Sequence, residues 1–207
     1  MALLHDDTDS EKKACILATA ERLFRDIGYL KTTVADIAKT LKMSPANIYR
    51  FFDSKKAIHE GVARRLMAEV EDAAEAIAAK PTPPRERMHE LLATVSRMNA
   101  EQFVGDSKIH EMVAIAMEES WEVCDAHIQR IVMTIASVIA DGAKAGVFNV
   151  TDVELAAKCV CAAMLRFFHP QMIEQAAKKP GPNVDQMIDF IVAGLTLGTP
   201  ELSGGTR

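Results

Sequence analysis

The stretch that decides the fold is TTVADIAKTLKMSPANIYRFFDSKKAI, residues 32–58. It contains two helix start signals close together. Thr33 stands three residues before Asp36, which is the spacing of a capped helix start with an acidic first turn. Ser44 is followed by Pro45, a residue that has no N–H to lose in the first turn of a helix. The stretch therefore predicts two helices in quick succession.

These two helices are expected at about 33–41 and 45–51, joined by LKM, with another helix before them. Three helices with this spacing fit a helix-turn-helix unit, whose second short helix lies in the major groove of DNA. Another interpretation stays open at this point. The run NIYRFF, residues 47–52, could instead be an aromatic junction that packs three short helices together, with its charges in water.

Hydrophobic residues recur at helical spacing over the remaining chain. A first helix ends at Gly28, and the clearest stripe runs from Trp121 to Ile139. No segment alternates as a strand does, so the predicted fold class is all-α. The run PTPPRE places a domain boundary near 80–84. The predicted organisation is a helix-turn-helix DNA-binding domain at 10–70 (helix-turn-helix at about 33–52), a linking helix, a helical bundle at 81–200, and frayed termini at 1–9 and 201–207.

Charge is distributed unevenly along the 207 residues. Residues 12–56 contain ten Lys or Arg and four Asp or Glu, a net charge of +6, while the rest contains fourteen basic and twenty-five acidic residues, a net of −11. A basic head on an acidic body indicates that only the head approaches a polyanion. Chance clustering on a solvated surface is the alternative.

The sequence contains no glycine-rich phosphate loop, no His-Glu-x-x-His and no nucleophile elbow, so we predict no catalytic residue and no cofactor. The apolar run at 131–140 is about half the roughly 20 residues of a membrane helix, and the N-terminus lacks the features of a secretory signal. We therefore expect a cytoplasmic protein that does not associate with membranes.

No metal site is expected. The candidate ligands are spread over several helices: His110, Glu111, His127 and His169. The four cysteines show no ligand-like pairing, so we interpret them as reduced thiols, with a redox sensor as the alternative. They are Cys15, Cys124, Cys159 and Cys161.

The quoted segment closely resembles the DNA-binding domain of the tetracycline-repressor (TetR) family. The matching features are Thr-Thr-Val at 32–34, Asp-Ile-Ala at 36–38, Met-Ser at 43–44, Ile48-Tyr49 and FFDSKKAI at 51–58, and the helix before them fits the same pattern. The resemblance covers about residues 10–65. It implies a homodimer on double-stranded, near-palindromic operator DNA, with three helices that bind DNA and a fourth that leads to the body.

Carried over by position, the resemblance implies DNA-binding residues Thr33, Ser44, Pro45, Ala46, Asn47, Tyr49, Arg50 and Lys55. Tyr49 and Lys55 match positions that typically contact phosphates. Asn47 and Arg50 carry side chains suited to adenine and guanine edges, respectively. Because Pro45 has no side-chain donor, base reading is expected mainly from these two residues.

The body resembles the family only in its architecture, which implies an effector pocket and pairing of the helices at 151–169 and 184–197 between two subunits. Methionines and aromatic residues suggest an adaptable apolar pocket. The predicted pocket consists of Met88, Phe103, Met112, Trp121, His127, Met133, Met164 and Phe167. The predicted dimer interface consists of Ala157, Cys161, Met164, Met187 and Ile191.

The leading hypothesis is a transcriptional repressor that a small apolar or amphipathic effector releases from its operator. One alternative keeps the same DNA-binding head but switches it by a protein partner or by thiol oxidation at Cys124, Cys159 or Cys161. Another alternative is an α-helical enzyme with the basic head as an addition. Plain core packing of the methionines is also open.

Overall fold

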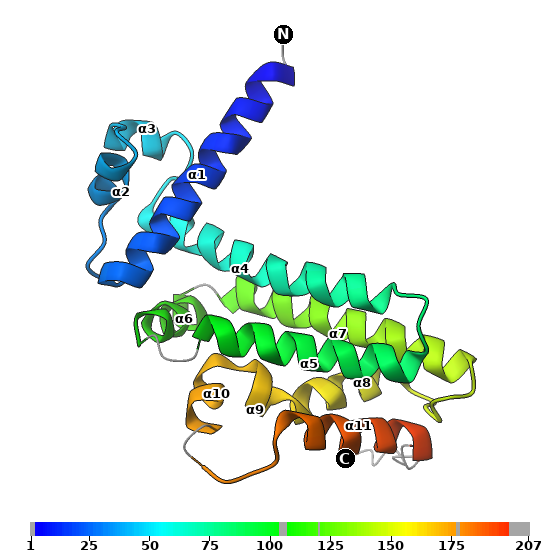
Figure 1. Cartoon of the computed structure of the whole chain (residues 1–207). Helices are drawn as coiled ribbons and strands as arrows, with labels where there is room; N and C mark the ends of the chain where they lie inside the picture. Colours follow the sequence, from blue (N-terminus) through cyan, green and yellow to red (C-terminus); the bar gives the residue numbers. More distant parts are fainter. Residues whose placement is uncertain (1–2, 104–106, 120, 177–178, 199–207) are drawn as a thin grey trace, which may run out of the picture. The chain divides into compact units, whose positions relative to one another are not determined.

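The computed structural model describes residues 3–103, 107–119, 121–176 and 179–198, and the described residues form helices without any strand (Figure 1). The all-α prediction is confirmed. The helices are α1 (Leu3–Ile27), α2 (Val34–Thr40), α3 (Pro45–Tyr49), α4 (Lys55–Ala78), α5 (Pro84–Phe103), α6 (Ser107–Glu119), α7 (Trp121–Lys144), α8 (Val153–Ala163), α9 (Leu165–Phe168), α10 (Pro170–Ala176) and α11 (Val184–Leu197).

The helices form two compact units. Unit 1 comprises Met1–Ala68 and Gly105–Asp125, and unit 2 comprises Glu69–Val104 and Ala126–Arg207. The division falls inside α4, whereas the prolines at 81–84 lie in the loop between α4 and α5. Those prolines end α4, but the residues on both sides of them belong to unit 2. A unit is defined by which helices pack together, and a loop between two helices does not have to separate units. Helix α6 therefore packs with the N-terminal helices although it lies far along the chain.

In unit 1, α2 and α3 lie side by side, and α2 also packs against α1 (Figure 1). Their buried side chains include Phe24, Ile37 and Ile48, each fully buried. Gly28 ends α1 with a φ of +96°, a left-handed conformation that glycine adopts without a steric penalty. The chain then turns directly into the cap of α2.

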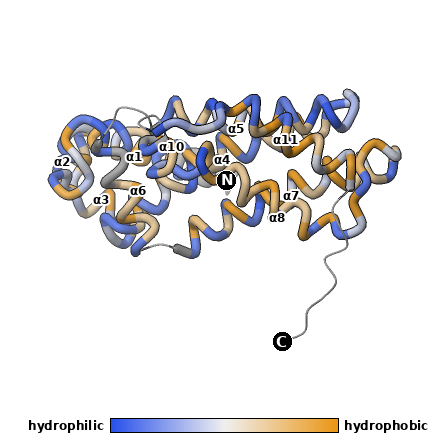
Figure 2. Tube along the Cα trace, turned by 90° about the horizontal axis from the view of Figure 1, so that it is seen from below, coloured by the Kyte–Doolittle hydropathy of each residue, from blue (hydrophilic) through white to orange (hydrophobic). Residues whose placement is uncertain are grey.

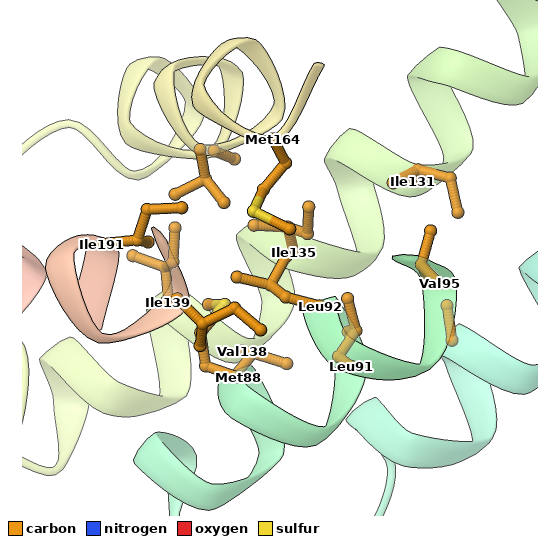
Figure 3. Close-up of a cluster of buried hydrophobic side chains, with 14 of the residues drawn as sticks. Met88, Leu91, Leu92, Val95, Ile131, Ile135, Val138, Ile139, Met164 and Ile191 are labelled. Atoms are coloured by element: carbon orange, nitrogen blue, oxygen red, sulfur yellow. The ribbon is translucent and has the colours of Figure 1, made fainter. Parts of the chain in front are cut away.

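Unit 2 is organised around one hydrophobic cluster contributed by α4, α5, α7, α8 and α11 (Figure 3). Met88, Leu92, Ile135 and Met164 are fully buried within it. Hydrophobic and hydrophilic residues recur along the helices, as expected for helices with one buried side (Figure 2). The buried Arg87 adds a polar tie, because it donates to the Ala78 carbonyl and pairs with Asp141 at 2.9 Å.

The predicted helix at 151–169 is interrupted in the structure. Asp152 caps α8 by accepting from the Leu155 N–H at 2.9 Å, and α8 ends at Ala163. A single helical turn, α9, follows, and His169 is then extended with a ψ of 124° because Pro170 disfavours helical backbone at the residue before it. The last helix has the predicted bounds, 184–197.

Helix α7 is the one described helix that is long and apolar enough to cross a membrane by length and composition. Its stretch Glu122–Lys144 has a mean hydropathy of 1.3, and 44% of that stretch is buried inside the protein. The core helix of a globular protein shows the same combination. The residues Ile131, Ile135, Val138 and Ile139 of this helix contribute to the core of unit 2.

Candidate nucleic-acid interface

Helix α3 presents a short exposed surface. Ile48 points inward and is fully buried, whereas Tyr49 remains 49% exposed. Arg50 follows as the C-terminal cap residue of α3, so the helix is two residues shorter than predicted. Pro45, Ala46 and Arg50 are exposed, and Asn47 is half-buried. Polar and hydrogen-bonding side chains therefore gather around one turn and a half of helix, in the arrangement of a recognition helix.

Both predicted helix caps are present. Ser44 accepts from the Asn47 N–H at 3.2 Å, and Thr33 forms a complete capping box with Asp36. The Thr33 hydroxyl donates to the Asp36 carboxylate at 2.6 Å, and this hydrogen bond lowers the pKa of Asp36 below its usual value. A phosphate at the start of α2 would thus compete with Asp36 for the Thr33 hydroxyl. The first role of the Thr33 hydroxyl is therefore to cap α2.

Lys55 is held at the start of α4. Its ammonium lies 4.1 Å from the centre of the Tyr29 ring and donates to the Leu30 carbonyl at 3.5 Å. The preceding Ser54 caps α4 by accepting from the Ala57 N–H at 3.0 Å. Lys55 is also the first residue of α4, and the backbone N–H groups and the dipole at the start of a helix favour an anion. These are the elements of a phosphate contact.

The turn between α2 and α3 has a feature that the sequence pattern does not reveal. Lys42 has a φ of +54°, which is the left-handed backbone conformation that residues other than glycine and asparagine rarely adopt. The Met43 N–H reaches the Ala38 carbonyl at 2.8 Å and closes the end of α2. A glycine at this position would have indicated the left-handed conformation in the sequence, whereas a lysine gives no such indication.

Two family profiles cover most of these elements. Residues 16–62 match the profile described as bacterial regulatory proteins, tetR family, and residues 84–187 match the tetracyclin repressor-like C-terminal domain. The second match alone spans half of the chain, and the first contains the whole helix-turn-helix unit. The chain belongs to the TetR family. It is a DNA-binding transcriptional regulator and not an enzyme.

Individual proteins resemble this TetR-family chain in sequence or in fold. The HTH-type transcriptional regulator YhgD of Bacillus subtilis (strain 168) is 25% identical over 155 residues, which cover 71% of this chain and 77% of YhgD. The TetR-family regulator PfmR of Thermus thermophilus is 26% identical with a TM-score of 0.59, over 87% of this chain and 98% of PfmR. The TetR-family repressor FadR of Thermus thermophilus, solved with lauroyl-CoA, has a TM-score of 0.62 at 18% identity, over 94% of this chain and 98% of FadR.

The predicted pocket residues of this TetR-family chain lie in several places. Met88 and Met164 are fully buried in the core cluster of unit 2, and Phe167 packs against it. Met133 is 70% exposed and lines an open hollow of about 350 Å³ that α4 and the following residue form with α7. Met112 is buried in unit 1. The side chains of Phe103 and Trp121 lie outside the described residues.

His127, another predicted pocket residue, is part of a charged cluster. Its Nδ1 lies 2.8 Å from one oxygen of the buried Glu71 carboxylate, and Arg130 donates to the other oxygen at 3.1 Å. His110 and Glu111 have no described side chains, and no described group of three or more His, Cys, Asp or Glu residues is arranged to hold a metal. His127 thus contacts the Glu71 carboxylate, and Arg130 binds the other oxygen of the same carboxylate.

The predicted dimer residues pack inside their own protomer. Ala157 and Met164 are fully buried, Ile191 is 7% exposed, and Cys161 and Met187 pack against the same core cluster. The outward side of these helices carries different residues. Phe190 and Leu197 of α11 are 76% and 82% exposed, and Leu155 of α8 is 41% exposed. Periodicity could assign these helices an apolar character, but it could not distinguish their inner from their outer apolar side.

Proposed function

We propose that this TetR-family protein is a homodimeric repressor that binds a near-palindromic operator and is released by a small apolar or amphipathic effector. The observation that carries the proposal is the display on α3: a buried Ile48 fixes the helix, while Asn47, Tyr49 and Arg50 remain accessible beside it. Asn and Arg side chains suit adenine and guanine edges, and each good pair contributes about 1–3 kcal/mol of discrimination. Tyr49 and Lys55 supply phosphate contacts.

The exposed side of α8 and α11 supports the homodimer. Phe190 and Leu197 lie seven residues apart, and the small residues Ala193 and Gly194 are exposed between them, so the four share one side of α11. On α8, Leu155 and Ala162 are similarly exposed and similarly spaced. Small residues between large apolar ones allow close approach of two helices. We therefore assign the contact between protomers to this outward side.

The effector proposal rests on the composition of the body. A core built with the fully buried Met88 and Met164 can adapt to an inserted apolar molecule, since methionine has three rotatable bonds and no branches. The same fold in FadR holds lauroyl-CoA, a molecule with an apolar chain and a charged head. Lauroyl-CoA is thus a reasonable first probe. We propose a cytoplasmic location, where the operator is.

The test is selection from randomised duplex DNA by the purified protein at a low and a high salt concentration, followed by sequencing. We expect a two-fold-symmetric motif whose half-sites are centred about one helical turn apart and which survives the higher salt. Retention without any motif, lost at high salt, would mean that the head contacts phosphates alone. That outcome would contradict an operator-specific regulator.

A switch by thiol oxidation remains the second candidate. Burial raises the pKa of Cys161 to about 11 and raises the pKa of Cys124 as well, which keeps both thiols protonated and unreactive. Cys15 and Cys159 are exposed. The candidate therefore rests on Cys159 among the three cysteines first considered for such a switch.

A further inference from the structure

A histidine is fully buried in the DNA-binding unit. His59 lies on α4 and its Nε2 is 3.1 Å from the Met112 carbonyl oxygen of α6. A carbonyl oxygen only accepts, so Nε2 carries the proton and donates. Both helices belong to unit 1 at this point. The hydrogen bond joins the helix that begins with Lys55 to a helix encoded more than fifty residues later.

Aromatic rings surround this imidazole. The Tyr29 ring centre is 4.4 Å from that of His59 with a tilt of 33°, and Phe24 meets Tyr29 edge-on at 5.3 Å. Tyr29 and Phe24 are buried. In such apolar surroundings a leucine would pack well, whereas an imidazole must have its polar atoms satisfied. The histidine therefore provides a directional contact that a leucine could not.

The same tyrosine also contacts Lys55. The ammonium lies 4.1 Å from the Tyr29 ring centre, within the range of a cation–π interaction. Because Lys55 and His59 are four residues apart, they lie on one side of α4, and both contact the Tyr29 ring. A free lysine samples many rotamers, so a fixed ring beneath the ammonium favours the conformation that the ring defines.

We propose that His59 is a positioning residue for DNA binding. Its hydrogen bond to the Met112 carbonyl fixes the imidazole against the Tyr29 ring, and that ring orients the Lys55 ammonium for contact with a phosphate. This inference rests on the proposed phosphate contact of Lys55. Helix α6 is also tied to α1, because Lys108 donates to the Asp26 carbonyl. The residues 84–187 that match the C-terminal profile include α6, so a segment of that region packs against the phosphate-contacting end of α4.

The experiment uses the full-length protein and the operator that the wild-type protein selects from randomised DNA. Affinity is measured over a range of salt concentrations for H59L, H59Q, K55A and the double variant H59L/K55A. Each phosphate contact contributes about 0.9 to the slope of log affinity against log salt, so K55A should flatten the slope by about 1.8 for two heads. We expect H59L to flatten it similarly.

Two further results are expected if His59 acts through Lys55. The double variant should bind within about twofold of K55A, because residues that act through one contact are not additive. H59Q carries an amide N–H near the place of Nε2 and should restore the wild-type slope. Ile58→Val is the control: it removes a methyl group from a fully buried neighbour on α4 and should leave the slope unchanged.

The outcomes separate the two proposals. Additive losses in the double variant, or weaker binding by H59L with an unchanged slope, would show that His59 merely supports the fold. If melting curves show that H59L is unfolded, H59Q decides the same question. A salt slope of H59Q as flat as that of K55A would contradict the role of the hydrogen bond. Wild-type protein that selects no DNA would instead contradict the proposed function.

Discussion

Lys42 carries backbone strain at a position that has no visible role in packing. Its φ of +54° costs a residue with a Cβ roughly 1–2 kcal/mol, and part of a gain from glycine is offset by the greater freedom of glycine in the unfolded chain. We expect Lys42→Gly to raise the free energy of unfolding by up to about 1 kcal/mol, measured by urea denaturation. Lys42→Ala keeps the strain, so an equal gain from alanine would contradict this account.

Arg50 and Lys55 should differ in what their loss does to DNA binding. Arg50 is exposed at the end of α3, where a guanidinium can read one base pair, and its replacement by alanine should relax preference at one operator position. Lys55→Ala should weaken binding to all sequences about equally. Affinities over a panel of single-base operator variants test this division. Identical profiles for the two variants would contradict it.

The capping carboxylate of α2 makes part of the stability depend on pH. Hydrogen bonds from Thr33 lower the pKa of Asp36 below its value in the unfolded chain, so its contribution is present above the unfolded-state pKa and is lost as the pH falls through the folded-state pKa. We expect the difference in Tm between wild type and Asp36→Ala to be constant near neutral pH and to shrink below about pH 4.

Asp36→Asn provides the control for this pH dependence. The amide keeps an acceptor oxygen for the Thr33 N–H but has no titratable group. Its Tm relative to Asp36→Ala should therefore change little over the same pH range. A difference between wild type and Asp36→Ala that persists unchanged at pH 2 would mean that Asp36 does not stabilise the cap through its charge.

At the scale of helices, the outward side of α11 is the feature with consequences for assembly. Phe190 is 76% exposed in the protomer, and an aromatic ring buried in a dimer contributes strongly to binding. If the proposed dimer forms through this side, Phe190→Glu should convert it to monomers and lower operator affinity by at least tenfold, measured by analytical ultracentrifugation and DNA binding. Ile128→Glu changes an exposed residue of α7 and should leave a dimer.

The sequence predicted those helices that have local start and stop signals. Caps at Thr33 and Ser44 and the glycine after α1 are short-range devices, and each is present in the structure. What the sequence did not predict depends on residues distant along the chain. The hydrogen bond between His59 and the Met112 carbonyl joins residues 53 positions apart. It forms because α6 packs with the N-terminal helices.

The predicted site residues divide in the same way. The exposure of the residues around α3 could be predicted, because one short helix with one buried residue leaves the others accessible; their contacts with DNA stay a prediction. For the predicted pocket and dimer residues the sequence does not indicate which way a side chain points, because an apolar residue on a helix can face the core of its own protomer or the outside. Met164 is fully buried in its own protomer, whereas Leu165, the next residue, is 49% exposed.

For the whole molecule, the charge distribution restricts how it meets DNA. The net charge of +6 at residues 12–56 and of −11 elsewhere gives attraction at the head and repulsion over the rest of the chain. Long-range charge also raises association rates at low salt, and salt screens both effects. An acidic body thus disfavours non-specific wrapping of DNA, which agrees with the proposed contacts being confined to α3 and the start of α4.

Redox control of the whole protein depends on which of its thiols can ionise. A thiol with a pKa of about 11, as at Cys161, is ionised in roughly one molecule in 10,000 at about pH 7, and the thiolate is the form that peroxide oxidises. Cys161 should therefore resist oxidation. Because the proposed switch is an apolar effector and not a thiol, we expect operator affinity to be unchanged after mild peroxide treatment, both in wild type and in Cys159→Ala. Loss of binding in oxidised wild type, prevented by Cys159→Ala, would instead establish a thiol switch at the exposed cysteine of α8. Loss that Cys159→Ala does not prevent would direct attention to Cys15, which is also exposed and lies on α1, within the DNA-binding unit.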